Sequence, residues 1–303
     1  MRSDILVFSA GSIFTIMPFF EMYLVLRFLR FLRGKNLRIV AVGVSIGPFH
    51  STRDQKWCLR ALSLMDSVLV RDYQSKLLID SATKRINTHV SFDLALSWNM
   101  AHLDIKSEQK PALIGLSTTE RAFGKCQKSH TDNCNRLVKA FEQILNKSNE
   151  VKIRILSVCS DERDGDNTIS THIFEMLRKK WGARIEIVIY REGKIDEILH
   201  SISECSLLIA ARMHAGIMGM LFTIPVYQIA YAVKIRNFFT HTELSTQYLY
   251  DHDNISQQSL YEFMVDALNG NLAEFSQIQK NILERKGEMV SCDLNNLARQ
   301  SSI

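Results

Sequence analysis

The stretch that decides the fold is SLLIAARMHAGIMGMLFTIPVYQIA, residues 206–230. Two apolar runs in it, SLLIA and PVYQIA, have the length and composition of buried strands, and a helical segment from about 214 to 222 lies between them. A strand, a helix and a second strand in this order form a parallel β-α-β unit. Arg212 and His214 stand at the corner where the first strand passes into the helix.

The same alternation extends along the chain on both sides of this unit. Strand-like runs begin at residues 4, 38, 67 and 89 in the first half, and at 112, 151, 184, 206 and 225 in the second half. Helical segments separate them, which is the pattern of doubly wound parallel sheets. The sequence therefore predicts an α/β protein with two Rossmann-like domains.

The domain boundaries follow from the composition. A polar, aperiodic stretch at 98–110 predicts an interdomain crossover. We expect the N-terminal Rossmann-like domain at 1–97, the C-terminal one at 111–255, and a helical tail at 256–303.

The charge is mildly basic, with 37 Lys and Arg against 32 Asp and Glu and a net charge of +5. No run of five or six basic residues occurs. This balance suits a small anionic ligand or an anionic membrane surface, and it does not call for nucleic acid as a partner. The six cysteines form no C-x-x-C pair, which argues against a zinc knuckle or a redox pair and favours buried reduced thiols.

The apolar N-terminal stretch imitates a membrane segment. Charged residues interrupt it too often for a spanning helix, and no signal-peptide cleavage site follows it. Arg27, Arg30 and Arg33 fall within one arc of a helix over 18–33, so we interpret it as a largely buried helix with one solvated stripe. The alternative is a helix lying on a membrane surface, which would make the protein a peripheral membrane contact.

The corner at Arg212 and His214 is the strongest candidate site. Ligands of open parallel sheets bind beyond the carboxyl ends of the strands. A helix N-terminus offers free N–H groups there, and an arginine adds a planar fork for carboxylate or phosphate. The corner is typical of an anion site with a titratable group beside it. The alternative, a helix-capping arginine and a satisfied core histidine, stays open at this point.

Other candidates follow neighbouring strands. Tyr231 and Lys234 come after the strand PVYQIA, and Ser117 and Arg121 come after the first strand of the second half. Gly47 lies in the loop GVSIGPFHS of the first half, where the backbone can approach a ligand closely. The chain lacks G-x-G-x-x-G, P-loop, H-E-x-x-H and G-x-S-x-G motifs, which argues against a dinucleotide oxidoreductase, an NTPase, a zinc protease and an α/β-hydrolase.

The order of several motifs resembles the polysaccharide pyruvyl transferase family. The resemblance is carried by DILVFSAGSIF, VGVSIGPFHS, SVLVRDYQS, VSFDLAL and the RMHA block with its trailing IP and Y-x-x-K. It implies a GT-B-like arrangement of two Rossmann-like domains facing a cleft. The first domain would be on the acceptor side, and the second would hold the donor site.

The resemblance also implies an activity. The donor would be phosphoenolpyruvate, and the acceptor a glycan or lipid-linked oligosaccharide precursor of a cell-surface polysaccharide such as a capsule or exopolysaccharide. The product would be a pyruvate ketal, made in the cytoplasm without a cofactor or a metal. His214 matches the family's catalytic position, and Arg212, Tyr231 and Lys234 match its substrate-binding residues.

The chain also departs from the family. Its members usually begin with a further βαβ portion carrying an N-x-G-D signature, so we expect the first domain to be incomplete. Two alternatives remain at this stage: a nucleotide-sugar glycosyltransferase of the same shape, and a truncated, inactive member of the family.

Overall fold

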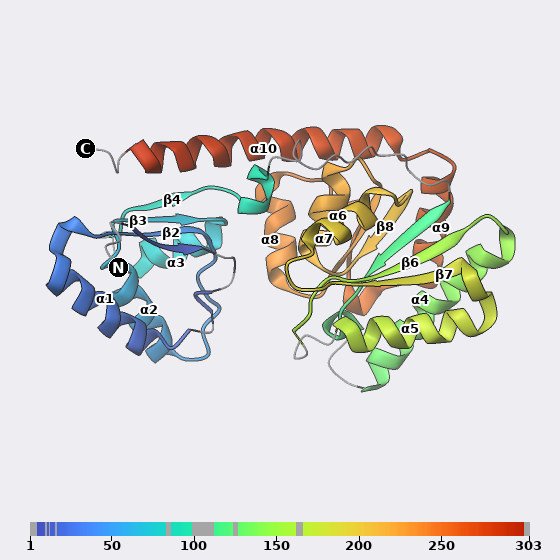
Figure 1. Cartoon of the computed structure of the whole chain (residues 1–303), viewed down its shortest axis with the longest axis horizontal. Helices are drawn as coiled ribbons and strands as arrows, with labels where there is room; N and C mark the ends of the chain where they lie inside the picture. The colour runs from blue at the N-terminus through green and yellow to red at the C-terminus, as the bar shows by residue number, and fades with distance from the viewer. Residues whose placement is uncertain are drawn as a thin grey trace. The chain divides into compact units, whose positions relative to one another are not determined.

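The chain divides into two compact units. The computed structural model describes residues 5–9, 11, 13–15, 17–82, 86–98, 112–123, 127–161 and 166–299 (Figure 1). Unit 1 comprises Met1–Trp98 with Arg285–Ile303, and unit 2 comprises Asn99–Glu284. Nearly all of the expected crossover at 98–110 lies outside the described residues.

Unit 1 is built on a four-stranded parallel sheet in the order β1-β2-β3-β4. Its strands are β1 (Ile5–Ser9), β2 (Arg38–Val44), β3 (Ser67–Val70) and β4 (Thr88–Val90), and its connecting helices are α1 (Phe19–Arg33), α2 (Thr52–Leu62) and α3 (Tyr73–Ala82). Because the strands follow one another in order and such connections are right-handed, all three helices cover one face of the sheet. Buried side chains of these helices, such as Leu26, Cys58 and Ile79, form one core with Ile39 and Val68.

The other face of this sheet is covered by α10 (Ala273–Arg299), whose residues from Arg285 onward belong to unit 1. Leu294 and Leu297 of this helix pack against a small cluster of Val40, Val42 and Leu69. The unit therefore has three layers, and one of them comes from the far end of the sequence.

Unit 2 is built on a six-stranded parallel sheet in the order β10-β9-β8-β5-β6-β7. Its strands are β5 (Leu113–Ser117), β6 (Lys152–Ser157), β7 (Ile185–Ile189), β8 (Leu207–Ala210), β9 (Val226–Ala230) and β10 (Leu249–Asp251). Its helices are α4 (Gln127–Lys147), α5 (Asp166–Trp181), α6 (Ile195–Ser203), α7 (Met213–Leu221), α8 (Val233–Thr242), α9 (Gln257–Leu268) and the first part of α10. Figure 1 shows α4 and α5 on one side of this sheet and α7 on the other.

The strand order of unit 2 reverses at one point. The chain runs outward from β5 through β6 to β7, then returns to the other side of β5 with β8 and continues through β9 to β10. A crevice forms at the carboxyl ends of the two strands where the order reverses, and this switch point is where open α/β sheets bind ligands. In unit 2 the switch point lies between β5 and β8.

The two parallel sheets confirm the predicted α/β class, and most predicted elements begin within two residues of the observed ones. The short strand β10 was not predicted. The run that begins at residue 89 contributes only its first two residues to a strand, because Asp93 then accepts a hydrogen bond from the Ala95 N–H and caps a 3₁₀ turn, Leu94–Ser97. The tail at 256–303 is divided between the two units.

The prediction that the first helix is largely buried is wrong. Only Phe19, Met22 and Leu26 of α1 are buried, whereas most of its other apolar side chains are exposed. Arg30 is not part of a solvated stripe, because its guanidinium donates to the carbonyls of Leu64 and Leu37 at 2.9 and 2.6 Å. The helix is apolar nearly all round, and the single sheet face beside it covers only one stripe.

No disulfide joins the five cysteines in the described part of the chain: Cys58, Cys134, Cys159, Cys205 and Cys292. Burial raises the pKa of the Cys134 thiol to about 11 and that of Cys58 further still. The expectation of buried thiols holds for Cys58, Cys134 and Cys205, but Cys159 is only half-buried and Cys292 is exposed.

Candidate active site

The candidate site lies at the switch point of unit 2. In the ladders between β5, β8 and β9, Ser117 is level with Ala210, and Ala210 is level with Gln228. Residues that are level in paired strands point to the same face of the sheet. The Ala211 N–H also donates to the Ser117 carbonyl at 2.7 Å, so the last residue of β5 lies beside the segment that leads into α7.

Arg212 occupies the N-cap position of α7, with φ −74° and ψ 123°. The helix begins at Met213, close to the predicted start at 214. The Arg212 Nε donates to both carboxylate oxygens of Asp166, at 2.9 and 3.1 Å, and Nη2 donates to Oδ1. Arg212 makes no side-chain capping bond, so the alternative of a helix-capping arginine is wrong.

The pair of Arg212 and Asp166 is largely removed from water. Asp166 is the first residue of α5 and its side chain is fully buried, while that of Arg212 is 15% exposed. A buried charge is stable only when it is paired and hydrogen-bonded, and the planar fork of arginine provides a two-point contact. Asp166 therefore fixes the plane of the guanidinium at the edge of the sheet.

His214 is the second residue of α7 and is exposed. The alternative that it is a buried core histidine is therefore wrong. Two residues further on, Gly216 is buried, and a Cβ there would lie 1.9 Å from Oε1 of Gln228. Glycine is needed at this position because the Gln228 amide lies against the first turn of the helix.

Three buried polar atoms near this corner have no hydrogen-bond partner among the residues that the structure describes. They are the hydroxyls of Ser117 and Thr118 and the Oε1 of Gln228, whose Nε2 donates to the Ala210 carbonyl at 2.8 Å. All three side chains are at most 1% exposed. A buried hydroxyl without a partner costs about 1–3 kcal/mol, so a cluster of such groups beside a helix N-terminus is typical of a ligand site.

The remaining predicted residues of unit 2 follow the same strand ends. Tyr231 comes directly after β9 and packs in part against the main core, and Lys234 is exposed in the first turn of α8. Arg121 is exposed in the 3₁₀ turn Glu120–Phe123 that follows β5. The structure thus brings Arg212, Tyr231 and Arg121 to the carboxyl ends of three neighbouring strands.

Gly47 belongs to unit 1, so its contact with a substrate stays a prediction. It is buried with φ +76°, and its N–H donates to the Phe14 carbonyl at 3.3 Å. A positive φ of this size strongly favours glycine. The backbone conformation of the loop is therefore enough to explain why a glycine stands at position 47.

A second polar corner lies in unit 1, after β3. The Arg71 guanidinium donates to Oδ2 of Asp93 at 2.5 Å and to the Ser45 hydroxyl at 2.8 Å. Ser45 in turn donates to Asp72 at 2.7 Å, and Asp72 accepts from the Ser75 N–H in the first turn of α3 at 2.8 Å. These bonds join the ends of three strands into one buried network.

The sequence analysis missed Asp166, Thr118 and Gln228. Asp166 stands in the stretch CSDERDGD, where several acidic residues lie close together and none stands out. For Gln228 the signal was present, because an amide inside the apolar strand PVYQIA needs a buried partner. Thr118 had no signal beyond its place after a strand end.

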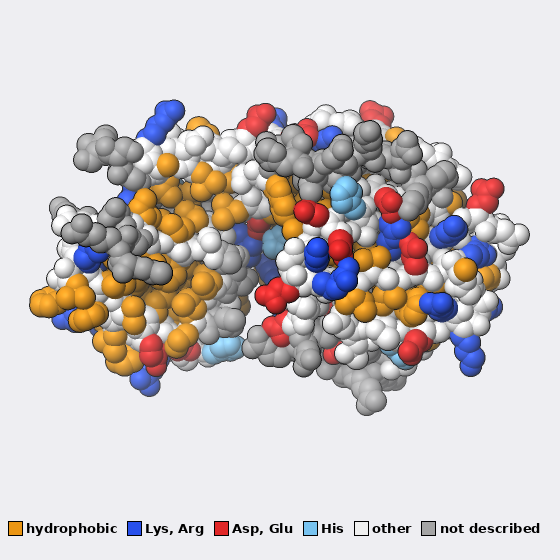
Figure 2. All heavy atoms as spheres, in the orientation of Figure 1, with side chains coloured by type: hydrophobic (Ala, Val, Ile, Leu, Met, Phe, Trp, Pro, Cys, Tyr) orange, Lys and Arg blue, Asp and Glu red, His pale blue; other side chains and the backbone are white. Residues whose placement is uncertain are grey.

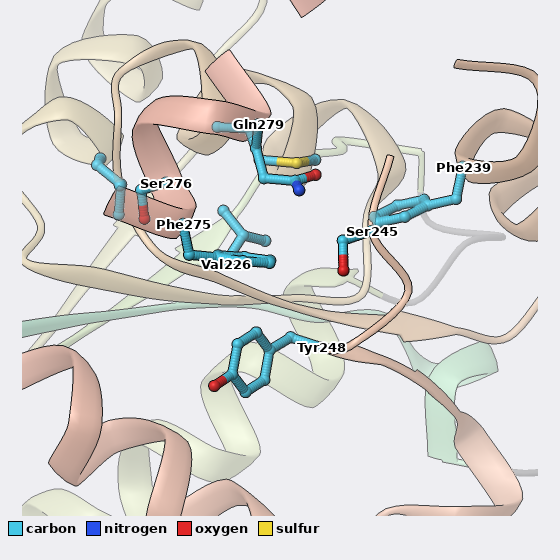
Figure 3. A pocket seen from close by; sticks show the side chains of 9 residues that line it. Val226, Phe239, Ser245, Tyr248, Phe275, Ser276 and Gln279 are labelled. Carbon is cyan, nitrogen blue, oxygen red and sulfur yellow. The ribbon is translucent and has the colours of Figure 1, made fainter. Parts of the chain in front are cut away.

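A small pocket lies at the opposite end of α7 from Arg212. It is bordered by side chains from α7, β9, α8, α10 and the segment before β10, including Val226, Phe239, Tyr248 and Gln279 (Figure 3). Its free space is about 10 Å³, which is room for one water molecule. The pocket is too small for a metabolite and is not part of the candidate site.

No group of three or more His, Cys, Asp and Glu side chains that could hold a metal ion occurs in the described ranges. Metal independence remains a prediction.

Solved structures with the same fold include GT-B glycosyltransferases. TarM has a TM-score of 0.54 and 16% identity, over 87% of this chain and 50% of TarM. HepE of Anabaena, solved in complex with UDP and glucose, has a TM-score of 0.57 and 13% identity, over 99% of this chain and 77% of HepE. The trehalose-6-phosphate synthase OtsA has a TM-score of 0.58 and 10% identity, over 95% and 71%. The chain thus has the GT-B fold, and it spans only half the length of TarM.

The family model of the polysaccharide pyruvyl transferases matches residues 2–232, which is more than half of the chain. The protein belongs to this family. The matched range contains Asp166, Arg212, His214 and Tyr231, and ends just before Lys234. No curated protein matches the chain.

Proposed function

We propose that the protein transfers a pyruvyl group from phosphoenolpyruvate to two hydroxyls of one sugar and so forms a cyclic ketal. Membership of the family supports pyruvyl transfer to a polysaccharide. The choice of phosphoenolpyruvate as donor rests on the switch-point corner of unit 2. There the ion-paired Arg212 stands beside the hydroxyls of Ser117 and Thr118, which have no partner among the described residues. Every one of these groups can donate a hydrogen bond to an anion.

Phosphoenolpyruvate carries a carboxylate and a phosphate, and both need donors. The N–H groups of the first turn of α7 have no partner within the helix, and they add partial positive charge. Arg212 supplies a full charge whose orientation Asp166 fixes. We assign donor binding to Arg212, Ser117 and the start of α7, with Thr118 as a further hydroxyl.

The reaction needs one acid and a base. Protonation of C3 makes C2 electrophilic, and a sugar hydroxyl then attacks C2 and gives up its proton. The bond from C2 to the phosphate oxygen breaks, phosphate leaves, and a second hydroxyl of the same sugar closes the ketal with loss of its own proton. His214 is the titratable side chain at the helix start, and we assign it the proton transfers.

The remaining predicted residues are assigned from their places in the fold. Tyr231, Lys234 and Arg121 follow the same strand ends and are assigned to substrate binding. Gly47 is assigned to the acceptor side, on unit 1. The acceptor is a glycan or lipid-linked oligosaccharide precursor, and the reaction takes place in the cytoplasm, where phosphoenolpyruvate is available.

Replacement of His214 tests the mechanism. Because His214 is exposed, His214→Gln and His214→Ala are expected to leave the melting temperature unchanged. Turnover is expected to fall by about 10²–10⁴-fold, the usual contribution of a general acid–base group, while phosphoenolpyruvate still binds through Arg212. His172 is an exposed histidine on α5, and His172→Gln serves as the matched control with unchanged turnover. A fully active His214→Gln variant would contradict the assignment.

The competing donor is a nucleotide sugar, as in HepE, which was solved with UDP and glucose. A thermal-shift comparison separates the two donors. Stabilisation by phosphoenolpyruvate, absent in Arg212→Ala, supports our proposal. Stabilisation by UDP-sugars alone would overturn it.

A further inference from the structure

The outer side of α1 carries a stripe of exposed apolar side chains. The outer stripe consists of Phe20 (39% exposed), Leu24 (47%), Val25 (57%), Phe28 (59%), Phe31 (84%) and Leu32 (57%). Phe20, Leu24, Phe28 and Phe31 follow helical spacing along one side of α1. Figure 2 shows hydrophobic side chains gathered over the part of the molecule that holds α1 and α2. Exposed apolar surface of this kind marks an interaction site.

Aromatic and basic side chains border the outer stripe. The Trp57 ring of α2 lies 4.7 Å from that of Phe20 and 5.3 Å from that of Tyr23, measured between ring centroids. The guanidinium of Arg60 lies 4.7 Å from the centre of the Trp57 ring, and Arg27 donates to the Tyr23 hydroxyl at 3.2 Å. Trp, Tyr and Arg around an apolar stripe are typical of a surface that binds the interface of a lipid bilayer.

The net positive charge of the chain resides in unit 1. This unit holds 16 Lys and Arg against 9 Asp and Glu, a net charge of +7, whereas unit 2 holds 21 against 23, a net charge of −2. Arg53, Lys56 and Arg60 are exposed on α2, the helix that packs against α1. The charge of unit 1 is therefore complementary to an anionic surface, and part of it lies next to the outer stripe.

We propose that the outer stripe of α1 lies on an anionic lipid surface, with Phe28 and Phe31 inserted into its interface. The contact is peripheral, and no helix in the described part of the chain is long and apolar enough to cross a membrane. A second copy of the chain fits less well, because a symmetric dimer through α1 would bring two faces of the same +7 unit together. The inference does not depend on the proposed reaction.

Flotation of the full chain with lipid vesicles tests the proposal. The chain is expected to float with vesicles of phosphatidylcholine and phosphatidylglycerol, to bind vesicles of phosphatidylcholine alone more weakly, and to lose binding as salt rises. Phe28→Glu and Phe31→Glu remove apolar groups that are mostly in solvent, so the fold should persist, as circular dichroism can check. Each is expected to reduce binding at least about tenfold, since one inserted aromatic side chain contributes more than a factor of ten.

Two further variants test whether binding depends on the basic residues beside α1 and on the outer stripe itself. Lys56→Glu is expected to weaken binding to the anionic vesicles only. Ile278→Glu changes an apolar residue of α10 in unit 2 that is 49% exposed, and it should leave binding unchanged. Failure of the wild-type chain to float with anionic vesicles would overturn the proposal. So would an equal loss in Ile278→Glu, or light scattering that shows a dimer which Phe31→Glu dissociates.

Discussion

Arg71 in unit 1 and Arg212 in unit 2 stand at corresponding corners. Each lies within two residues of the end of a parallel strand and within two residues of the start of the next helix, and each pairs with an aspartate that follows a different strand. The side chains of Arg71 and Asp93 are 7% and 6% exposed, and those of Arg212 and Asp166 are 15% and 0% exposed. Each unit thus stabilises a largely buried arginine by pairing it with a buried aspartate.

The corners differ in what surrounds the ion pair. In unit 1 Ser45 links Arg71 to Asp72, so these three side chains bond to one another. In unit 2 the neighbouring hydroxyls of Ser117 and Thr118 have no partner among the described residues. Side chains that bond to one another stabilise a structural corner, whereas buried donors without partners lower stability and are retained where a ligand binds. The comparison separates a structural corner from a binding corner.

The largest expected effect is a loss of stability when Arg71 of the unit 1 corner is replaced. Arg71→Met leaves the carboxylate of Asp93 buried without its partner, so we expect a loss of about 3–5 kcal/mol in the free energy of unfolding. The double variant with Asp93→Asn also removes the buried charge at position 93 and keeps an acceptor for the Ala95 N–H, so it should recover most of the loss. Urea unfolding followed through Trp57 measures both. A loss under about 1 kcal/mol in the single variant would show that Arg71 is not a buried structural partner.

The second prediction concerns the close contact between Gly216 and the Gln228 amide at the switch-point corner of unit 2. Gly216→Ala places a methyl group where Oε1 of Gln228 now lies, and that amide is held by its bond to Ala210. We expect a net loss of about 1–2 kcal/mol, since overpacking outweighs the better helix propensity of alanine. Urea unfolding in a double-mutant cycle checks this. In a Gln228→Ala background the same change should be neutral or stabilising, and an unchanged loss there would place the clash elsewhere.

The smallest effect compares two serines that end neighbouring strands. Ser117 and Ser157 are both 0% exposed, but only the Ser157 hydroxyl has a partner in the structure, the Oδ1 of Asn167. Ser117→Ala should therefore raise the free energy of unfolding by about 1 kcal/mol, and Ser157→Ala should lower it by about as much. Urea unfolding measures both, and affinity for phosphoenolpyruvate should fall in the first variant. A loss of stability in Ser117→Ala would mean that its hydroxyl is satisfied in the free protein.

The sequence predicts the fold of this protein well and its site only in part. Buried parallel strands are nearly continuous apolar runs, so β2, β5 and β8 stand out from the letters alone. Arg212 and His214 stand out as well, because charged groups between two apolar runs have few structural explanations. Periodicity does not show which stripe of an all-apolar helix is covered, and this is why the exposure of α1 was missed.

The partner of Arg212 could not be predicted for a different reason. Asp166 is separated from it by 46 positions and stands in the stretch CSDERDGD, where several acidic residues look alike in the sequence. Only the strand order, which places β8 beside β5 rather than beside β7, brings the two corners together. The order of the strands in the sheet cannot be read from a single sequence, so a contact that depends on this order cannot be predicted from it.

The long helix α10 also bears on the order in which the polypeptide is made and completed. The ribosome synthesises the strands and the first three helices of unit 1 before any of unit 2, but the layer that covers Val40, Val42 and Leu69 is made after Glu284. Domains generally fold as units during synthesis, at about 5–20 residues per second. Unit 2 is contiguous and can fold on the ribosome as it emerges, whereas one face of the nascent sheet of unit 1 is covered only in part, by Leu94, until Leu294 and Leu297 leave the exit tunnel. For that interval the first-made part of the chain exposes apolar surface that can aggregate, and chaperones can protect it.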